Sequence, residues 1–477
     1  MSEALFANSQ LRPGISIHLV GIGGAGMSAI ARVLLGRGYR VSGSDLQAND
    51  QTKALAAAGA IVYVGHDARH VHDTELVVIS SAVPDSNPEL VAARESGITV
   101  IKRAELVGSL MAGSVGIAVA GTHGKTTTTG MIAHMLLETG NDPTVILGGT
   151  LPELGGNGRY GEGPYFVVEA DEYDYMFLGL RPDLAVITNV EHDHPDVFPT
   201  QDAYRDAFSK FIALLPADGR LYVCFDDQGI QELVADTALP HPRLKTYGLQ
   251  NGSNQVDIRA LDSQANQMGG TDFVVEVGGQ TIGLARLSIP GVHNVRNALA
   301  AIAVGLDLGI DFAQICRALA GFGGVQRRFQ VIGEVADVII IDDYAHHPTE
   351  IKATLAAARQ RYPNRRLWAV WQPHTFSRTR RMMADFAASF HEADRVIVLD
   401  IYRSRESNNL GLSAADVVAR MQHPNAVYIP AREAAAEYLL ERVSPGDVIL
   451  TLGAGDGNLV GEWVLNGLRE QRGIKVN

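Results

Sequence analysis

Short apolar runs alternate with amphipathic, alanine-rich stretches along the whole chain, a pattern that predicts parallel strands connected by helices. In the first part, strands are predicted at residues 16–20, 40–43, 61–64 and 76–79, and helices at 27–36 and 52–58. A glycine turn follows the first strand. This order is typical of a Rossmann-like domain, and we place its end near residue 110 because a new strand, loop and helix begin at Val115.

The middle of the chain combines fully apolar runs with alternating ones. Runs at 115–120, 165–169 and 184–188 suit a central parallel sheet, whereas stretches near 256–276 and 280–287 alternate as edge hairpins do. Helices are predicted at 126–138 and 294–308, followed by a glycine-rich linker at 321–324. We therefore predict a P-loop ATPase-type domain with a mixed sheet over residues 111–325.

The last part returns to the first pattern. Strands are predicted at residues 338–341, 367–371, 396–399 and 448–452, with helices between them. This indicates a second Rossmann-like, doubly wound sheet over residues 326–477. The predicted fold class is therefore α/β with three domains, at residues 1–110, 111–325 and 326–477.

The strongest chemical signal is the loop at residues 121–126, which reads Gly-Thr-His-Gly-Lys-Thr. It turns a strand into a helix, and a helix N-terminus binds phosphate through its unpaired N–H groups. Lys125 can reach the outer phosphates of ATP, and the Thr126 hydroxyl suits Mg²⁺. The full pattern asks for glycine at position 119, where the chain has Val119, so this is a shortened variant. An ordinary glycine turn is the weaker alternative.

Two acidic segments follow later strands of the same predicted sheet. Glu169 ends an apolar strand, where a carboxylate meets Mg²⁺ or a nucleotide, and we interpret the other acids of residues 170–174 as a solvated turn. Residues 189–196 hold His192 and His194 among three carboxylates. Their spacing does not suit zinc, so a Mg²⁺ site beside ATP is favoured. A capping or turn role for either histidine remains open.

A second glycine motif, Gly-Ile-Gly-Gly-Ala-Gly, occupies residues 21–26 after the first strand. Asp45 lies where a ribose-binding acid is expected. The motif is weakly specific because the same turn holds any pyrophosphate on a helix N-terminus. Both a nicotinamide dinucleotide and a UDP-sugar fit it.

In the third part, two loops leave the carboxyl ends of strands, where ligands bind in open α/β sheets. Residues 342–350 contain His346 and His347 before Pro348, which is well placed to start a helix. Residues 372–380 contain His374 and Arg378. Imidazole and guanidinium groups suit a carboxylate substrate, although packing at a domain interface is the alternative for His347.

Charge and composition narrow the function classes. A net charge of −13 argues against a general nucleic-acid binder. The two cysteines, Cys224 and Cys316, are too few for a disulfide framework. No apolar run reaches the roughly 18–20 residues of a membrane span, and residues 1–10 lack the features of a signal peptide. By elimination we expect a cytoplasmic protein without a membrane partner.

Taken in order, these motifs resemble those of the Mur ligases of peptidoglycan synthesis. The resemblance covers the whole chain and is carried by the two glycine motifs, Glu-Ala-Asp-Glu at 169–172, Asn-Val-Glu-His-Asp-His at 189–194, His-Asn-Val-Arg-Asn at 293–297, Arg-Arg-Phe at 327–329 and Tyr-Ala-His-His-Pro-Thr-Glu at 344–350. It implies an ATP-dependent ligase whose three domains bind a UDP-substrate, ATP and an amino acid.

The resemblance also implies roles for individual residues. The UDP-substrate would lie on Gly21, Gly23, Gly24, Gly26, Asp45, Ser80 and Ser81. ATP would contact Gly121, Thr122, His123, Gly124, Lys125, Thr126, Thr127, His293, Asn294, Asn297 and Asp343. Mg²⁺ would be held by Thr126, Glu169 and His194, and the amino acid by Tyr344, His346, His374 and Arg378. Catalysis would rest on Lys125, Glu169, His194, Arg327 and His346.

Among the activities of this family, the chain resembles the one that adds L-alanine to the lactyl carboxylate of UDP-N-acetylmuramate through an acyl phosphate. The Gly-Gly-Ala-Gly-Met loop at 23–27 and the run at 372–379 favour this activity over the related recycling of whole peptides, in which the sequence Glu-Ala-Asp-Glu-Tyr-Asp also occurs. Many members carry arginine where this chain has Thr375, which leaves Arg378 as the expected carboxylate-binding side chain. A hinge near Gly323 is expected to close the domains.

Two other classes of function compete with the ligase. A nicotinamide oxidoreductase would explain the first domain but leave the 121–126 loop without a role. A nucleotide-gated binding module would bind ATP without turnover, and it does not explain the polar clusters on all three predicted domains.

Overall fold

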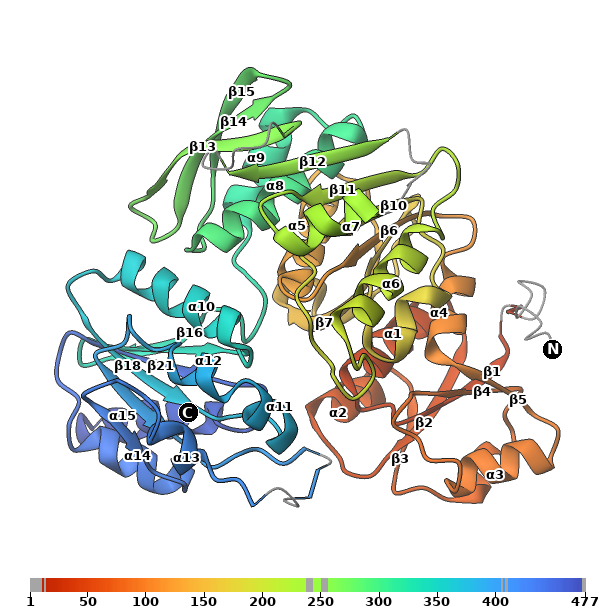
Figure 1. Ribbon diagram of the computed structural model, residues 1–477. Coiled ribbons are helices and arrows are strands. Elements are labelled where there is room, and N and C mark those ends of the chain that lie inside the picture. The colour runs from red at the N-terminus through yellow and green to blue at the C-terminus, as the bar shows by residue number, and fades with distance from the viewer. Residues whose placement is uncertain are drawn as a thin grey trace. The chain divides into compact units, whose positions relative to one another are not determined.

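The computed structural model describes residues 11–12, 14–236, 243–249, 256–404, 406–407 and 411–473. Residues 1–10, on which the expectation about a signal peptide rests, lie outside these ranges. The described chain forms three sheets with helices between their strands (Figure 1). It divides into two compact units. The first comprises Met1–Asp262, Phe273–Ala285 and Arg296–Phe322, and the second comprises Ser263–Asp272, Arg286–Val295 and Gly323–Asn477.

The first sheet is entirely parallel and has the order β3-β2-β1-β4-β5. Its elements are β1 (Ser16–Val20), α1 (Ala25–Gly36), β2 (Arg40–Asp45), α2 (Asp50–Ala57), β3 (Ile61–Val64), the 3₁₀ turn η2 (Ala68–Val71), β4 (Leu76–Ile79), α3 (Pro88–Glu95), β5 (Thr99–Lys102) and α4 (Arg103–Leu110). Alternate residues of β1 face opposite helices: Ile17 and Leu19 share a core with α1, and Val20 shares one with α3. The predicted Rossmann-like sheet is confirmed.

The second sheet has ten strands in the order β15-β14-β13-β12-β11-β10-β6-β9-β7-β8. Its elements are β6 (Val115–Ala120), α5 (Lys125–Glu138), β7 (Thr144–Leu151), η3 (Pro152–Leu154), β8 (Gly156–Arg159), β9 (Tyr165–Glu169), η4 (Tyr173–Gly179), β10 (Leu184–Ile187), α6 (Gln201–Ile212), β11 (Arg220–Cys224), α7 (Gln228–Asp236), β12 (Leu244–Leu249), β13 (Ile258–Ala265), β14 (Thr271–Val277), β15 (Gln280–Arg286), α8 (Val292–Asp307) and α9 (Phe312–Gly321).

This sheet is mixed, as predicted. Strand β6 pairs in parallel with β9 and β10, whereas β7 and β8 are antiparallel. Two residues connect β14 to β15, and such a short connection joins antiparallel strands. The carboxyl ends of β6, β9 and β10 therefore lie side by side at one edge of the sheet, where the polar loops of residues 121–126, 170–174 and 188–194 begin.

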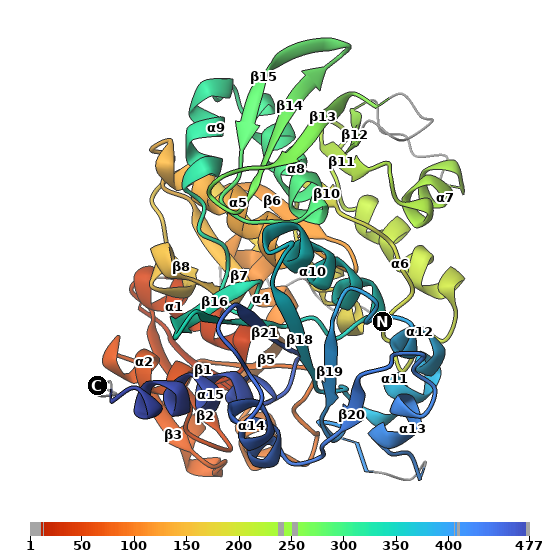
Figure 2. The same cartoon turned by 90° about the vertical axis from the view of Figure 1, so that its left-hand side faces the viewer.

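Strands β7 and β8 were not predicted, because glycines at 148, 149, 155, 156 and 158 interrupt the apolar pattern. They pack against α1 of the first sheet, and Figure 2 shows α1 beside β8. Asn157 Nδ2 donates hydrogen bonds to Ala25 O at 2.7 Å and to Ser28 Oγ at 2.9 Å. A Cβ at Gly158 would overlap the backbone of Ala29, so this close approach requires glycine.

The third sheet has the order β16-β17-β21-β18-β19-β20, and its only antiparallel pair among the pairings described is β16 with β17. Its elements are β16 (Gln330–Val335), β17 (Val338–Asp343), α10 (Pro348–Arg361), β18 (Arg366–Trp371), α11 (Phe376–Arg381), α12 (Met383–Ala387), β19 (Arg395–Val398), α13 (Ala414–Val418), β20 (Ala426–Tyr428), α14 (Arg432–Leu440), β21 (Asp447–Leu452) and α15 (Asn458–Gln471).

Helices cover both faces of this sheet. Ile339 and Ile341 of β17 belong to a core that α10 to α13 complete, whereas Val338 and Ile340 belong to a core with α14 and α15 (Figure 1). This is why β17 reads as a continuous apolar run. The doubly wound prediction is confirmed, but the antiparallel edge strand β16 was not predicted.

Most predicted elements lie within a few residues of those observed. Helix α2 begins two residues before its predicted start, because Asn49 and Thr52 form a reciprocal cap at its N-terminus. The domain boundaries near residues 110 and 325 stay predictions. In the ranges that the structure describes, no helix is both long enough and apolar enough to cross a membrane.

Candidate functional site

The loop at residues 121–124 turns β6 into α5. Gly121 and Gly124 have φ values of +131° and +80°, in the region that favours glycine. A Cβ at Gly124 would lie 2.8 Å from Asn297 Oδ1 of α8, and one at Gly121 would overlap Thr188, directly after β10. The loop therefore packs tightly against two elements of its own unit, and the unpaired N–H groups of α5 begin here, as a phosphate site requires.

Lys125, the first residue of α5, forms a buried ion pair. Its Nζ lies 2.9 Å from Glu172 Oε2 and also donates to the carbonyl oxygens of Gly121 at 2.5 Å and Thr122 at 3.1 Å. Burial alone would lower the pKa of Lys125, but the negative charge of Glu172 outweighs it and raises this pKa. Burial would likewise raise the pKa of Glu172, and the positive charge of Lys125 lowers it. Both groups are therefore charged.

Glu172 was missed by the sequence analysis. Its side chain is only 1% exposed, so the interpretation of residues 170–174 as a solvated turn is wrong for this residue. Besides Lys125 it faces His194 Nε2 at 3.6 Å and accepts a hydrogen bond from Tyr204 OH at 3.2 Å. Tyr204 OH also lies 3.0 Å from Thr122 Oγ1. One carboxylate thus connects the lysine of the loop, a predicted metal ligand and α6.

Thr126 and Glu169, two of the predicted metal ligands, are in direct contact. Thr126 Oγ1 donates to Glu169 Oε1 at 2.9 Å, and Glu169 Oε2 accepts the N–H of Gly148 at 2.7 Å. The contact follows from the topology, because β9, which Glu169 ends, pairs with β6, which leads into the loop. The third predicted ligand, His194, has a positive φ of 52° and lies against Glu172.

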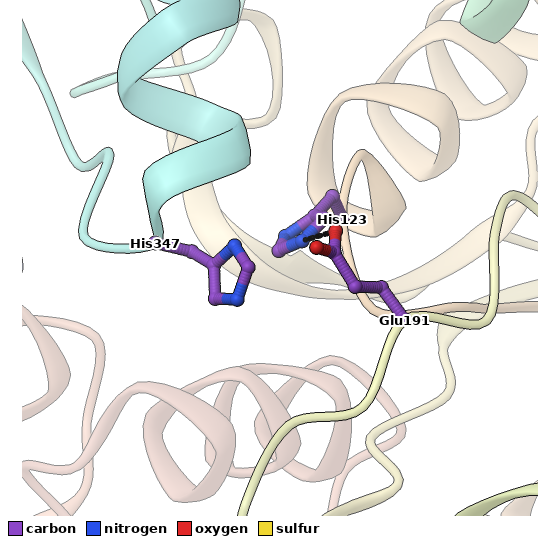
Figure 3. Close-up of side chains that lie close together, drawn as sticks. All are labelled: His123, Glu191 and His347. Carbon is purple, nitrogen blue, oxygen red and sulfur yellow. Dashed lines mark hydrogen bonds and ion pairs between the residues drawn. The ribbon is translucent and has the colours of Figure 1, made fainter. Parts of the chain in front are cut away.

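The loop that follows β10 holds the backbone of residues 122 and 123. Asn189 accepts the N–H of His123 at 2.9 Å and donates to its carbonyl at 3.0 Å. Thr122 Oγ1 donates to Glu191 O at 2.7 Å. His123 Nε2 lies 3.0 Å from a carboxylate oxygen of Glu191 (Figure 3, which also draws His347 of the second unit). These contacts fix the shape of the loop.

The glycine turn at residues 21–26 is held by the end of β2. Gly21 has a φ of +81°, and the N–H groups of Gly21 and Ile22 donate to Ser44 O at 2.8 and 3.0 Å. The N–H of Gly23 donates to Asp45 Oδ2 at 2.9 Å. The structure therefore brings the predicted acid Asp45 together with the predicted turn.

Two residues that follow strands of the first sheet, Ser81 after β4 and Arg103 after β5, contact the acidic loop at residues 170–174. The guanidinium of Arg103 occupies the space that a Cβ on Gly26 would fill, and it binds Asp171 at 2.7 Å. Ser81, predicted to bind the UDP-substrate, donates to Asp174 Oδ2 at 2.5 Å. Arg103 was missed, because a lone arginine at the start of a helix carries no signal in the sequence.

In the second unit, Arg327 has a positive φ of 58° and is held in place on three sides. Its Nε donates to Asp342 Oδ2 at 2.8 Å, and its Nη2 donates to Gly453 O at 2.9 Å. Its guanidinium carbon lies 5.1 Å from the ring centre of Tyr344. Two predicted site residues, Arg327 and Tyr344, are therefore neighbours.

Asp343 ends β17 and is buried. Its carboxylate accepts the N–H groups of Phe329 and Ala345, each at 2.8 Å. Burial raises the pKa of Asp343 to about 6, although the charge of Arg328 and these hydrogen bonds act in the opposite direction. Asp343 fixes the two loops that carry Arg327 and His346.

The predicted amino-acid residues are partly clustered. The ring of His346 lies 5.4 Å from that of Tyr344 and 5.8 Å from that of His374, and His374 stacks on Tyr402 at 5.6 Å. Arg378 lies on α11 and is buried. Thr375 has a positive φ of 63° and precedes α11.

Other histidines and asparagines have local structural partners. His347 accepts the N–H of Thr349 at 3.3 Å and caps α10, which begins at Pro348 as predicted. Asn294 donates to Pro290 O at 2.6 Å. His293 adjoins Gly291 in the same turn, where a Cβ would overlap the imidazole.

The buried Lys125–Glu172 pair predicts strong coupling in stability. Glu172→Gln leaves a buried ammonium without its counter-charge, and Lys125→Met leaves a buried carboxylate, so each is expected to lower the free energy of unfolding by about 3–5 kcal/mol. The double variant is expected to lose much less than the sum. Urea unfolding followed by circular dichroism gives the free energy of unfolding of wild type, the two single variants and the double variant. Glu162→Gln, on an exposed side chain, is the control. Additive losses would contradict the pair.

Asp343 predicts a pH dependence of the second unit. Its folded pKa of about 6 exceeds the reference value of 3.8, so the folded state binds the proton more tightly. The free energy of unfolding of this unit is therefore expected to fall by up to about 3 kcal/mol as the pH rises from 3.8 through about 6. Asp343→Asn is expected to remove this pH dependence.

All three tryptophans, Trp368, Trp371 and Trp463, lie in this unit, so their fluorescence follows its unfolding alone. Asp385→Asn, on an exposed side chain, is the control. An identical pH dependence in wild type and Asp343→Asn would refute the assignment.

Comparison with known families accounts for nearly the whole chain. Residues 16–114 match the catalytic domain of the Mur ligase family, residues 119–305 match the Mur ligase middle domain, and residues 327–455 match the Mur ligase glutamate ligase domain.

Similar proteins and similar solved structures indicate the same family. The chain is 47% identical over 464 residues to the UDP-N-acetylmuramate–L-alanine ligase of Geobacter sulfurreducens, covering 96% of this chain and 98% of the relative. It is 46% identical over 456 residues to that of Geotalea uraniireducens, with 95% and 98% covered. The crystal structure of UDP-N-acetylmuramate-alanine ligase from Thermotoga maritima matches with a TM-score of 0.81 and 31% identity, over 96% of this chain and 100% of the other. A murein peptide ligase from Psychrobacter arcticus matches with a TM-score of 0.70 and 26% identity, over 95% and 99%. The chain belongs to the Mur ligase family of ATP-dependent ligases.

Proposed function

We propose that the chain joins L-alanine to the lactyl carboxylate of UDP-N-acetylmuramate, with ATP converted to ADP and phosphate, in peptidoglycan precursor synthesis. The observation that carries this proposal is the 46–47% identity to two UDP-N-acetylmuramate–L-alanine ligases over nearly their full length. The geometry supports it, because a phosphate loop and a pyrophosphate-type glycine turn belong to one compact unit. A cytoplasmic location follows from these substrates, and we propose neither a nucleic-acid nor a membrane partner.

The first step brings two anions together. A lactyl carboxylate oxygen attacks the γ-phosphorus of ATP, the bond to the bridging oxygen of ADP breaks, and an acyl phosphate forms. Lys125 and the N–H groups at the start of α5 supply positive charge and positioning, which dominate catalysis of phosphoryl transfer. From the second unit, Arg327 is proposed to add a guanidinium, and Asp343, His293 and Asn294 are proposed to meet the nucleotide.

The chemistry of Thr126 and Glu169 fits Mg²⁺. A hydroxyl and a carboxylate oxygen, 2.9 Å apart beside the phosphate loop, are the hard oxygen donors that this ion prefers. We propose that Thr126, Glu169 and His194 hold it. When bound, the ion would neutralise charge on the phosphate oxygens.

The UDP-substrate is proposed to lie on Gly21, Gly23, Gly24 and Gly26, with Asp45 at the ribose and Ser80 and Ser81 nearby. The N-terminus of α1 favours a diphosphate at this turn. Arg103, whose guanidinium lies against Gly26, adds a positive charge there.

The second step forms the amide. The amine of L-alanine attacks the acyl-phosphate carbonyl carbon, and inorganic phosphate leaves from a tetrahedral intermediate while the nitrogen loses a proton. We propose that Tyr344, His346, His374 and Arg378 receive the amino acid, with His346 near the amine and Arg378 at the carboxylate. Because residues of both units serve one reaction, closure at the linker near Gly323 is part of the proposal.

Phosphate release tests the whole reaction. It is expected only when ATP, UDP-N-acetylmuramate and L-alanine are all present. Replacing L-alanine with the tripeptide L-alanyl-γ-D-glutamyl-meso-diaminopimelate, which appears in the name of a related ligase, is expected to abolish phosphate release.

Positional isotope exchange in ATP, measured with UDP-N-acetylmuramate but without L-alanine, tests the acyl phosphate. Full turnover without any exchange would count against that intermediate, and turnover only with the tripeptide would reassign the substrate.

Lys125→Ala separates the ATP site from the UDP site. The variant is expected to lose at least a thousandfold in kcat, because no ammonium remains at the transferred phosphate. Binding of UDP-N-acetylmuramate, measured by calorimetry, is expected to stay within a few-fold of wild type, which also shows that the variant folds. Wild-type activity in Lys125→Ala would refute the ATP-site assignment.

A further inference from the structure

A buried carboxylate, Glu89, lies among three histidines of the first sheet, and no step of the proposed reaction uses it. Its side chain is fully buried at the start of α3. One oxygen, Oε1, faces His70 Nδ1 at 2.7 Å and His18 Nε2 at 3.6 Å. The other, Oε2, faces His66 Nδ1 at 2.9 Å and accepts a hydrogen bond from Ser44 Oγ at 2.6 Å. The donors come from β1, β2, η2 and the loop after β3.

This carboxylate is charged in spite of its burial. Burial would raise the pKa of Glu89, but the nearby ring of His18 and the hydrogen bonds from Ser44 and His70 outweigh it and lower the pKa to about 2. Glu89 also lies in the first turn of α3, where the helix dipole favours an anion. An ionised carboxylate only accepts hydrogen bonds, so it holds O–H and N–H donors in fixed directions.

The first connection from Glu89 to the glycine turn passes through Ser44. The hydroxyl of Ser44 donates to Glu89, and its carbonyl oxygen accepts the N–H groups of Gly21 and Ile22 at 2.8 and 3.0 Å. The side chain and the carbonyl of one residue thus connect the buried acid to the start of the turn.

A second connection reaches Asp45 from its other side. The carbonyl oxygen of Asp45 accepts the N–H of Gly65 at 2.7 Å, and His66, the next residue, faces Glu89 at 2.9 Å. Asp45 in turn accepts the N–H of Gly23 through its carboxylate. Two segments that adjoin Asp45, residue 44 and residues 65–66, are therefore in contact with Glu89.

We propose that Glu89 is a positioning residue for the UDP-substrate: by holding Ser44 and His66, it fixes the Asp45 carboxylate and the N–H groups of the glycine turn in the arrangement that binds the nucleotide. This inference rests on the proposed function, which places the UDP-substrate on that turn. Glu89 lies behind the turn and acts through Ser44 and His66.

Glu89→Gln tests the proposal. The amide keeps the shape of the side chain but carries no charge, and its N–H groups face either Ser44 and His66 or His18 and His70, so the four side chains no longer converge on one anion. The variant is expected to bind UDP-N-acetylmuramate at least tenfold more weakly in calorimetry. Its KM for that substrate is expected to rise similarly, while kcat and the KM values for ATP and L-alanine stay within twofold. Glu95→Gln, at the exposed end of α3, is the matched control and is expected to behave as wild type.

A second variant cuts the connection at its other end. Ser44→Ala keeps the buried anion and its histidines, and it is expected to weaken UDP-N-acetylmuramate binding at least threefold with the same selective rise in KM. Because Ser44→Ala removes the donor itself, it decides the question if the two variants disagree or if Glu89→Gln does not fold.

The outcomes separate this inference from the function on which it rests. If wild type binds UDP-N-acetylmuramate and both variants bind it equally well, or if they lower kcat without a selective change in KM, the positioning role is overturned and the proposed function stands. If wild type does not bind UDP-N-acetylmuramate, both are overturned.

Discussion

The phosphate loop depends on an ammonium group that is buried before any ligand arrives. A site for the outer phosphates of ATP needs positive charge away from water, and an unpaired buried charge is too unstable to keep. Glu172 resolves this conflict, because it lies 2.9 Å from Lys125 and is itself nearly inaccessible. Phosphates that attract Lys125 would leave Glu172 in need of other donors, and His194 and Tyr204 already face it. The ion pair with Glu172 therefore keeps the charged ammonium of Lys125 buried at the phosphate loop without an uncompensated charge.

One short acidic segment distributes its carboxylates among several partners. Within six residues, Glu169 contacts Thr126, Asp171 binds Arg103, Glu172 binds Lys125 and Asp174 accepts from Ser81. Asp174 and Tyr175 have positive φ values of 53° and 56°, conformations that persist only where their surroundings hold them. The segment thus connects the phosphate loop with the sheet that carries the glycine turn, and its sequence is dictated by contacts in two directions.

Strands, turns and helices could be predicted from the sequence where the hydrophobic periodicity and the turn residues indicate the same element. The strand, glycine turn and helix around Gly21, and the strand, loop and helix around Gly124, were predicted closely, because each depends on neighbours within a few residues. Strands β7 and β8 were missed, since Gly158 serves the close approach to Ala29 and not the strand pattern. Glu172 was misread as part of a solvated turn, because its partner Lys125 is 47 residues away in the chain.

Histidines show most clearly why the remaining site chemistry could not be predicted. His347, beside the predicted His346, caps a helix. In contrast, no motif contains His18, His66 or His70, and these three converge on Glu89. Glu89 and Glu172 are both buried anions behind a turn expected to bind an anion, which by Coulomb's law alone would weaken binding. Both are surrounded by donors that offset this charge. What each carboxylate contributes is therefore fixed geometry, since an acceptor-only group surrounded by donors permits few arrangements of the backbone that those donors belong to.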